Sequence, residues 1–479
     1  MKKKYRVKTC KEFCILYEKL FRIILKHINQ AIVSNQYVSV HYAYPLKRND
    51  FKNGMPNFGE TFLDKEPKDY SSIFTLHKSQ KDKICFKDIP EFNELYKFVR
   101  NKKYLSKKID YFSSSKKDGT HLFLAVISQA NKYVHNYGTT RYSIKRFRNI
   151  AGKYINYLFQ EKATLDIYIP ILLTNFEFNS FAINENIQVV RMDDIFQLSR
   201  QTINGHGSGV HKTVLGCATH CLKLQYYNFS YENVFDIVHK TSNINAYPLD
   251  TIDQFFASIR ICLGIDTGYA QLISKLIDVE EVFAAAKLIE LHGTSLRAYP
   301  SKFDNYAWNE SVPSISREGM KKIKKIYLKL LENGDKKIEL SVDRINRSFL
   351  RNHHEDSFLD DLIGLESLLT DDSKDSLKYK LSLRLAFLLS SNGEKNKNYK
   401  KIVSHLYDYR SAIVHGEKDK DKKRFVTIDG TKYDCNVESR KYVASTMEFI
   451  LLNYDSATIK ELSIYLDKCI FDYITDKSC

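Results

Sequence analysis

The sequence predicts an α+β protein, in which a mixed α/β N-terminal region precedes an all-α helical bundle. Strand-like runs such as LDIYIPILLTNFEF (165–178) occur within the first 335 residues. From Glu339 onward, apolar residues recur at helical spacing in one segment after another, with short connections. The 479-residue chain is too long for one ordinary core, so we expect domains at 1–335 and 336–479. The first could divide again near residue 245.

The N-terminal region alternates between helical and strand-like patterns. Apolar spacing predicts a helix over residues 11–32 and irregular structure with short strands over 35–90. A basic helix with an aromatic apolar face is expected over 139–159. Strands are expected in LDIYIPILLTNFEF, in IQVVRM (187–192) and in THCLKLQYYNF (219–229). These elements do not identify a known fold.

Residues 246–335 are expected to be helical again. The segment ISKLIDVEEVFAAAKLIEL (273–291) is the clearest helical pattern in this part of the chain. A connection with Pro300 and Pro313 follows. Ser316 then has the position of a helix N-cap, and Gly334 that of a helix end.

The charge and cysteine content narrow the functional classes. Lys+Arg 74 against Asp+Glu 57 gives a net charge of +17, which suits either a polyanion partner such as RNA or a lysine-rich solvated surface. Nine scattered cysteines favour free thiols in a reducing compartment over a disulfide framework. The start MKKKYRVKTCKEFC lacks the apolar core of a signal peptide, and the apolar runs are too short to cross a bilayer. We therefore expect a cytoplasmic protein without a membrane partner.

The segment LYDYRSAIVHG (406–416) contains the candidate catalytic residues. Arg410 and His415 are separated by four residues near the end of an amphipathic helix, and Gly416 has the position of a C-cap glycine. The helix dipole stabilises a charged histidine at that end. On an ideal helix the two residues lie about 140° apart, so they would not share one face. A facing copy of the same helix would complete a groove for both.

This segment resembles the R-x4-6-H signature of HEPN domains. The wider stretch resembles the Apea-like HEPN subfamily, with a first helix in FLRNHHEDSFLDDLIGLESLL around Glu366, a second in YKLSLRLAFLL with Arg384, and a third in LYDYRSAIVHG. The resemblance covers roughly residues 340–455. Some HEPN toxins carry a tyrosine two residues after the histidine, whereas Gly416 and Glu417 follow His415 here.

The resemblance implies a metal-independent endoribonuclease without a cofactor, acting as a homodimer through the HEPN domain. His415 would perform acid–base catalysis at the ribose 2′-hydroxyl, and Arg410 would hold the scissile phosphate, leaving 2′,3′-cyclic phosphate ends. Glu366, Arg384 and Ser411 would support the site, with Glu366 as a partner that orients Arg410 or Arg384. By itself, an arginine and a histidine at this spacing could equally be structural: Arg410 could pair with Glu366 or Asp408.

Proteins of this resemblance commonly act as toxins in bacterial anti-phage defence by abortive infection. The N-terminal region would then bind a phage-derived or cellular trigger. Two alternatives stay open: a catalytically inert HEPN module for dimerisation or RNA binding, and the toxin of a toxin–antitoxin pair. Five basic residues that follow the motif could form an RNA-binding lip or a mobile loop; they are Lys418, Lys420, Lys422, Lys423 and Arg424.

Other groups of possible metal-binding or RNA-binding residues have simpler, structural explanations. Cys217, His220 and Cys221, with His206 and His211 upstream, lack a second cysteine pair at zinc-finger spacing, and we expect no metal site. His353 and His354 precede a helix and could cap it or contact RNA. The basic and aromatic residues of 141–154 favour a helix with a buried aromatic face over an RNA-binding surface. The lysines of 321–329 present the same two alternatives.

Overall fold

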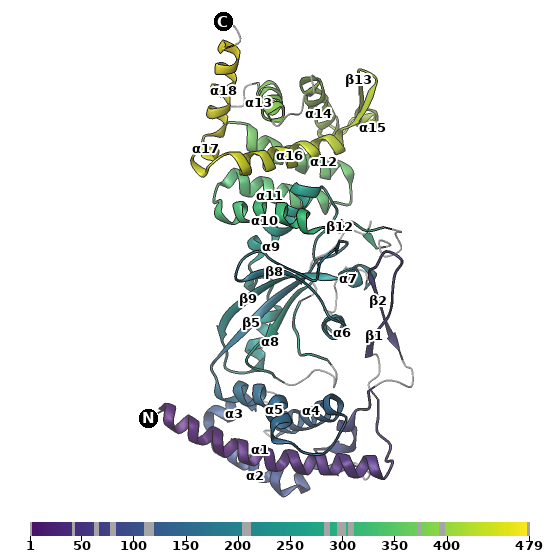
Figure 1. The fold of residues 1–479 in the computed structure, drawn as a ribbon, viewed down its shortest axis with the longest axis vertical. Helices are drawn as coiled ribbons and strands as arrows, with labels where there is room; N and C mark the ends of the chain where they lie inside the picture. Colours follow the sequence, from purple (N-terminus) through teal and green to yellow (C-terminus); the bar gives the residue numbers. More distant parts are fainter. Residues whose placement is uncertain are drawn as a thin grey trace.

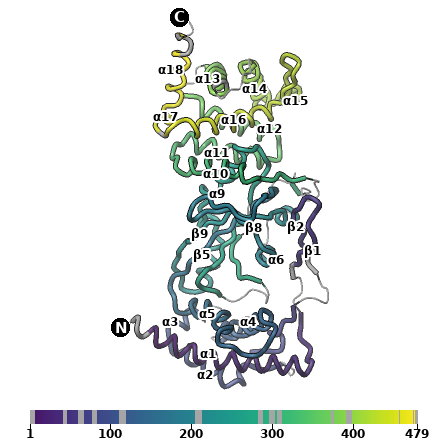
Figure 2. The backbone as a smooth tube through the Cα atoms, in the orientation of Figure 1, coloured from purple at the N-terminus to yellow at the C-terminus, as the bar shows by residue number. Residues whose placement is uncertain are grey.

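The computed structural model describes residues 2–40, 44–61, 67–76, 83–109, 119–203, 212–281, 288–294, 303–304, 311–371, 376–391 and 398–476. The molecule is elongated and has three parts stacked along its long axis (Figure 1). A helical layer lies at one end, a β-sheet in the middle and a helical bundle at the other end. Helices α1 and α18 therefore lie at opposite ends of the molecule (Figure 2). The expected α+β class is confirmed.

The first layer consists of five helices around an aromatic core. They are α1 (Lys2–Val33), α2 (Pro90–Arg100), α3 (Lys103–Ile109), α4 (Thr120–Tyr137) and α5 (Ile144–Phe159). The helix expected over 11–32 is confirmed as part of α1. The ring of Phe21 in α1 packs edge-on against Phe147 of α5, with centroids 5.1 Å apart. Phe147 and Tyr154 are buried, so α5 has the expected buried aromatic face.

Short elements link the layer to the rest of the chain. They are β1 (Tyr44–Asp50), β2 (Pro56–Thr61), η1 (Tyr70–Ile73), β3 (Phe74–Thr75), β4 (Ile84–Cys85) and η2 (Phe86–Asp88). Strands β1 and β2 form an antiparallel hairpin, and β3 pairs with β4 in parallel. These elements confirm the expectation of irregular structure with short strands over 35–90.

The middle part is a six-stranded antiparallel sheet with strand order β11-β10-β5-β9-β8-β7. The strands are β5 (Lys162–Pro170), β7 (Ser180–Ala182), β8 (Ile187–Arg191), β9 (His220–Ser230), β10 (Leu272–Leu276) and β11 (His292–Thr294). Around it lie α6 (Asp194–Gln201), α7 (Lys212–Gly216), α8 (Val234–Ser242) and η3 (Ile244–Ala246). A separate parallel pair joins β6 (Asn175–Phe176) to β12 (Ser314–Ile315). Strands β5, β8 and β9 confirm the three strand predictions.

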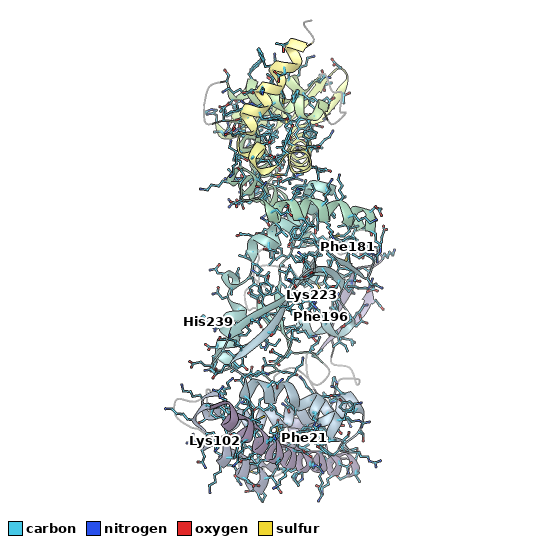
Figure 3. All side chains as sticks on the ribbon, turned by 60° about the vertical axis from the view of Figure 1, so that its left-hand side comes forward. Phe21, Lys102, Phe181, Phe196, Lys223 and His239 are labelled. Atoms are coloured by element: carbon cyan, nitrogen blue, oxygen red, sulfur yellow. The ribbon has the colours of Figure 1, made fainter. Side chains whose placement is uncertain are left out.

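Both faces of the sheet are covered by apolar side chains. Leu165 and Ile167 of β5 face the core shared with the first helical layer. Tyr168 faces the opposite core, where its ring lies 4.8 Å from that of Phe196 in α6. Figure 3 shows Phe196 and Lys223 together at the sheet, and Lys223 forms an ion pair with Asp166 at 2.9 Å. Burial on both faces explains why β5 has a nearly continuous apolar sequence.

The helix predicted over 273–291 is wrong where the structure describes it. Residues 272–276 form β10, between β11 and β5, and no helix is present over 277–281 or 288–291. The remainder, 282–287, lies outside the described residues. Strand β10 is buried on both faces, with Leu272 and Leu276 in one core and Ile273 in the other. A short apolar run buried in this way has no period that distinguishes it from a buried helix.

The C-terminal part is a bundle of helices. It contains α11 (Lys336–Phe349), α12 (His354–Leu369), α13 (Leu377–Ser391), α14 (Tyr399–Val414), α15 (Lys420–Lys423), α16 (Cys435–Asn453), α17 (Ser456–Lys460) and α18 (Leu462–Asp476). Helix α12 lies against α11 and α16, and Gly364 makes this possible: a Cβ atom there would lie 3.2 Å from Val443 and 3.4 Å from Arg344. The three helices on which the HEPN resemblance rests are α12, α13 and α14.

The apolar core of the bundle extends beyond the expected boundary at residue 336. Helices α9 (Leu249–Leu263) and α10 (Arg317–Glu332) lie between the sheet and the bundle (Figure 1). Ile261 of α9 and Ile326 and Leu330 of α10 belong to the core of the bundle. Ser316 caps α10 as expected, and its Oγ accepts the backbone N–H of Gly319 at 3.1 Å. Near residue 245, Ile237 and Tyr247 on either side contribute to one core.

The expectation of an all-α bundle needs one correction. The charged segment after the motif forms α15 and then a two-stranded antiparallel hairpin, β13 (Phe425–Ile428) and β14 (Thr431–Asp434). The turn between the strands is Asp429–Gly430, and both residues have positive φ. An Asp-Gly pair favours such a hairpin turn, which was a signal in the sequence. In the described part of the chain, no helix is both long and apolar enough to cross a membrane.

Candidate active site

Helix α14 positions the motif at the edge of the bundle. One face of the helix is buried, and it consists of Tyr399, Ile402, Val403, Leu406, Tyr409 and Ala412. The ring of Tyr409 packs against Phe358 of α12, with centroids 4.7 Å apart. This packing fixes the helix and leaves Arg410 half-buried, Ser411 exposed and His415 exposed.

The end of α14 has a defined geometry. His415 is the C-cap residue, and Gly416 follows with φ of 66°. The N–H of Gly416 donates to the carbonyl of Ile413 at 3.1 Å, and the N–H of Glu417 donates to that of Ala412 at 2.9 Å. These two bonds form a Schellman motif, which confirms the expected role of Gly416. The backbone of His415 is therefore held in place while its side chain faces solvent.

Arg410 differs from the other arginines of the bundle. Six arginines of 336–479 form ion pairs with carboxylates; they are Arg344, Arg347, Arg351, Arg384, Arg424 and Arg440. No described residue forms an ion pair or hydrogen bond with the guanidinium of Arg410. Asp408, one partner considered from the sequence, pairs instead with Lys378 at 3.2 Å. Arg410 is thus available to bind an anion.

A polar cluster surrounds Arg410. The hydroxyl of Tyr407 is buried, and its pKa is raised by burial and then by the nearby negative charge of Glu366. The positive charge of Arg410 acts on the same hydroxyl in the opposite direction. Glu366 of α12 is half-buried, and no described residue is hydrogen-bonded to its Oε1. The structure therefore brings together Glu366, Tyr407 and Arg410.

Tyr407 was missed from the sequence. It precedes Arg410 by three residues, so the two lie on the same side of α14. That spacing was a usable signal, but many tyrosines of this chain occur at helical spacing and are buried. Only the packing of α12 against α14 distinguishes Tyr407 from them.

The contacts of Arg384 hold helices together, and Glu366 is not among its partners. Its side chain is buried, and its guanidinium binds Asp467 at two points, Asp371 at 2.9 Å and the carbonyl of Leu369 at 2.7 Å. The expectation that Glu366 could orient Arg384 is therefore wrong. Ser411 lies one helical turn before His415, whose N–H donates to the carbonyl of Ser411 at 3.0 Å.

The five basic residues after the motif are largely neutralised by nearby carboxylates. Their ion pairs are Lys420–Glu355 at 2.8 Å, Lys422–Asp419 at 3.1 Å, Lys423–Glu417 at 2.6 Å and Arg424–Asp434 at 2.7 Å. Lys418 lies in a turn before α15, Lys420, Lys422 and Lys423 lie in α15, and Arg424 is its C-cap residue. Lys418 is exposed and forms no ion pair with a described residue. It is the member of this group most available to bind an anion.

The candidate metal ligands near residue 220 have structural roles. Both ring nitrogens of His220 are engaged, Nδ1 with the hydroxyl of Thr219 at 2.8 Å and Nε2 with the carbonyl of Phe178 at 2.6 Å. Burial lowers the pKa of His220 to about 4. Cys217 and Cys221 are buried in the core, and His206 and His211 lie outside the described residues.

In one group of side chains near the motif, the possible metal-ligand atoms lie close together. His354, Glu355 and Asp421 place one ligand atom each within 4.8 Å of one another. Asp421 is distant in sequence from the adjacent pair His354 and Glu355, so spacing could not reveal this group. His354 and Asp421 are exposed, and Glu355 is held by Lys420. His353 is the N-cap residue of α12, although its side chain forms no cap hydrogen bond.

Comparisons with known proteins returned nothing: no family model, curated protein or solved structure matches this chain. The resemblance to HEPN domains therefore rests on the helices and motif described above.

Proposed function

We propose that the chain is a metal-independent endoribonuclease in which Arg410 and His415 act on RNA. The observation that carries this proposal is the state of the two side chains at the end of α14. Among the arginines that the structure describes in the bundle, Arg410 alone has no carboxylate partner, and His415 is exposed at a helix end closed by a Schellman motif. A guanidinium binds phosphate oxygens at two points, and an imidazole transfers protons near neutral pH.

The reaction follows from these two groups. The imidazole of His415 accepts the proton of a ribose 2′-hydroxyl, whose oxygen attacks the adjacent phosphorus. The bond from phosphorus to the 5′-oxygen breaks, and that oxygen takes a proton from a protonated imidazole. Arg410 binds the non-bridging oxygens, where negative charge grows. The products are a 2′,3′-cyclic phosphate and a 5′-hydroxyl, so DNA would not be cut.

The proposed catalytic unit is a symmetric homodimer. Arg410 and His415 lie about 140° apart around the helix axis, and no described contact joins them within one chain. A two-fold axis beside α14 would face each Arg410 with a second His415, supplying both a base and an acid. Val414 between them is 62% exposed, which leaves an apolar contact available at that axis.

The wider role that we propose is an RNA-cutting effector, with RNA as its substrate and the cytoplasm as its compartment. Its activity would be controlled by the region before α10, whose trigger would be phage-derived or cellular. This assignment to defence by abortive infection follows the HEPN resemblance only.

The test is incubation of the purified chain with total RNA. We expect the wild-type protein to fragment RNA and His415→Ala to be inactive while folded. The matched control is His239→Ala, because His239 is exposed in the last turn of α8 and lies away from the bundle (Figure 3). Excess His415→Ala chain should also reduce wild-type activity through mixed dimers. Full activity of a folded His415→Ala protein contradicts the proposal, and insensitivity to the excess contradicts the dimer.

A further inference from the structure

A second site of the bundle is a pocket of about 680 Å³ on the side of α9. Its walls are the end of α9 at Ile261 and Cys262, the segment before α12, and the first turns of α16. This volume is sufficient for a ligand of nucleotide size. Neither Arg410 nor His415 lines it, so the pocket is distinct from the candidate active site.

The lining of this pocket is predominantly basic. Its potentially cationic side chains are Arg351, His353, His354, Arg424, Arg440 and Lys441. Among the described residues that line it, Glu448 is the one acidic side chain, and it pairs with Lys322 at 2.7 Å. A concave surface with charge of one sign concentrates its field and attracts ligands of the opposite sign.

The carboxylates behind the pocket balance this charge only in part, since Asp434 neutralises Arg424 at 2.7 Å but the other arginines are less fully paired. Asp360 serves two arginines at once, since Arg344 and Arg351 each lie 2.7 Å from its oxygens. Asp361 is fully buried, and neither of its oxygens is hydrogen-bonded to a described residue. Arg440 lies 3.5 Å from it, while burial raises the pKa of Asp361 to about 7. Part of the charge of Arg351 and Arg440 is therefore available to a ligand.

Two helices begin at the same pocket. The segment 352–354 contains the N-cap of α12, and no side chain caps that helix end. Asn436, Val437 and Arg440 belong to the first turns of α16. Asp434 caps α16, because its Oδ1 accepts the N–H of Asn436 at 3.0 Å. Of the two helix starts, that of α12 therefore offers free backbone N–H groups, and together with the helix dipole these favour negative charge. Ile261, Val437 and Ala444 add apolar surface, which a planar base could cover.

We propose that this pocket binds a phosphate-bearing nucleotide, with the phosphate between Arg351, Arg440 and the start of α12. The ligand would touch α9 on one side and the bundle on the other. Arg424, a pocket residue, follows α15, and Lys420 of α15 pairs with Glu355 in the first turn of α12. A ligand bound in the pocket would thus influence the position of the segment that directly follows His415. The inference does not depend on ribonuclease activity.

The test is calorimetric binding of the four ribonucleoside monophosphates, their nucleosides, inorganic phosphate and a 5′-phosphorylated RNA pentamer to the full chain. We expect binding that needs both phosphate and base. The variant Arg351→Gln/Lys441→Gln should weaken it by at least about tenfold. The matched control is Lys321→Gln/Lys325→Gln, which removes the same charge from the exposed face of α10 and should leave binding unchanged.

If a monophosphate binds more tightly than the pentamer, the ligand is a free nucleotide. If the pentamer binds more tightly, the ligand is an RNA strand. Either result supports the site. Equal affinity for nucleosides and nucleotides would overturn the inference. So would equal binding by the two double variants, or no binding of any probe at about 1 mM. If the first double variant fails to fold, the single variant Lys441→Glu replaces it.

Discussion

The guanidinium of Arg384 meets the carboxylate of Asp467 at two points, with Nε 2.8 Å from Oδ1 and Nη2 2.7 Å from Oδ2. This pair fastens α13 to α18, and Arg384 also donates to the carbonyl of Leu369 at the end of α12. Arg384 is therefore held from three sides, whereas Arg410 on the next helix has no such partner. The two arginines of the HEPN-like helices thus have opposite environments.

Arg384→Gln should destabilise the fold far more than Arg410→Gln. Loss of a buried guanidinium leaves carboxylates and a carbonyl without a partner, at a cost on the order of 3 kcal/mol. This cost lies at the lower end of the usual range because the side chain of Asp467 is 55% exposed. Arg410→Gln should cost about 1 kcal/mol or less, since it breaks no ion pair. Urea denaturation of both variants measures this difference; similar losses of stability would contradict the structural assignment.

Tyr407→Phe should lower RNA cleavage without unfolding the protein. The hydroxyl of Tyr407 is influenced by the charges of both Glu366 and Arg410, so its removal should change the polar surroundings in which the guanidinium binds a phosphate. The ring remains, and the stability should change by about 1 kcal/mol or less. The matched control is Tyr409→Phe, which removes a buried hydroxyl on the opposite, core-facing side of α14. Cleavage rates that are equal in the two variants would exclude a positioning role for Tyr407.

The pH dependence of stability should contain a contribution from Asp361. Its pKa is about 7 in the folded protein because of burial, against an ordinary value of about 3.8 that applies to the unfolded chain. Between these values the folded state binds more protons, so this contribution to stability falls as pH rises and levels off above about pH 7. Asp361→Asn should therefore be more stable than wild type at pH 8, and the difference should shrink toward pH 4. Thermal unfolding across this range is the measurement; a constant difference would contradict it.

A fragment of residues 316–479 should be more stable than a fragment of residues 336–479. The shorter one lacks α10, whose Ile326 and Leu330 are buried in the core of the bundle. Burial of each such side chain stabilises the longer fragment by about 1.5–3 kcal/mol, and the shorter fragment lacks this contribution. If the N-terminal region restrains the ribonuclease, the longer fragment should also be more toxic in cells than the full chain. Equal thermal stability of the two fragments would show that α10 is not part of the bundle's core.

Local patterns in the sequence were sufficient for most helices and for the end of α14. Gly416 and Ser316 were identified because caps depend on neighbouring residues only. Strand β10 was not identified, because burial on both faces removes the alternation of apolar and polar residues that identifies a strand. The sequence also could not distinguish the environment of Arg384 from that of Arg410. Arg384 is paired with Asp467 and Arg410 lies near Glu366, and both carboxylates are distant in sequence from these arginines. The pocket beside α9 likewise requires helices that only the tertiary fold brings together.

The most direct test of the central claim uses two RNA oligonucleotides that differ at one position. The first is all-RNA, and the second has a 2′-deoxyribose at the site where the first is cut. With excess chelator present, the wild-type chain should cut the first to a 2′,3′-cyclic phosphate end and leave the second intact at that site. His415→Ala should cut neither. Cleavage at the deoxy position, a requirement for added metal, or unchanged cleavage by folded His415→Ala would contradict the account.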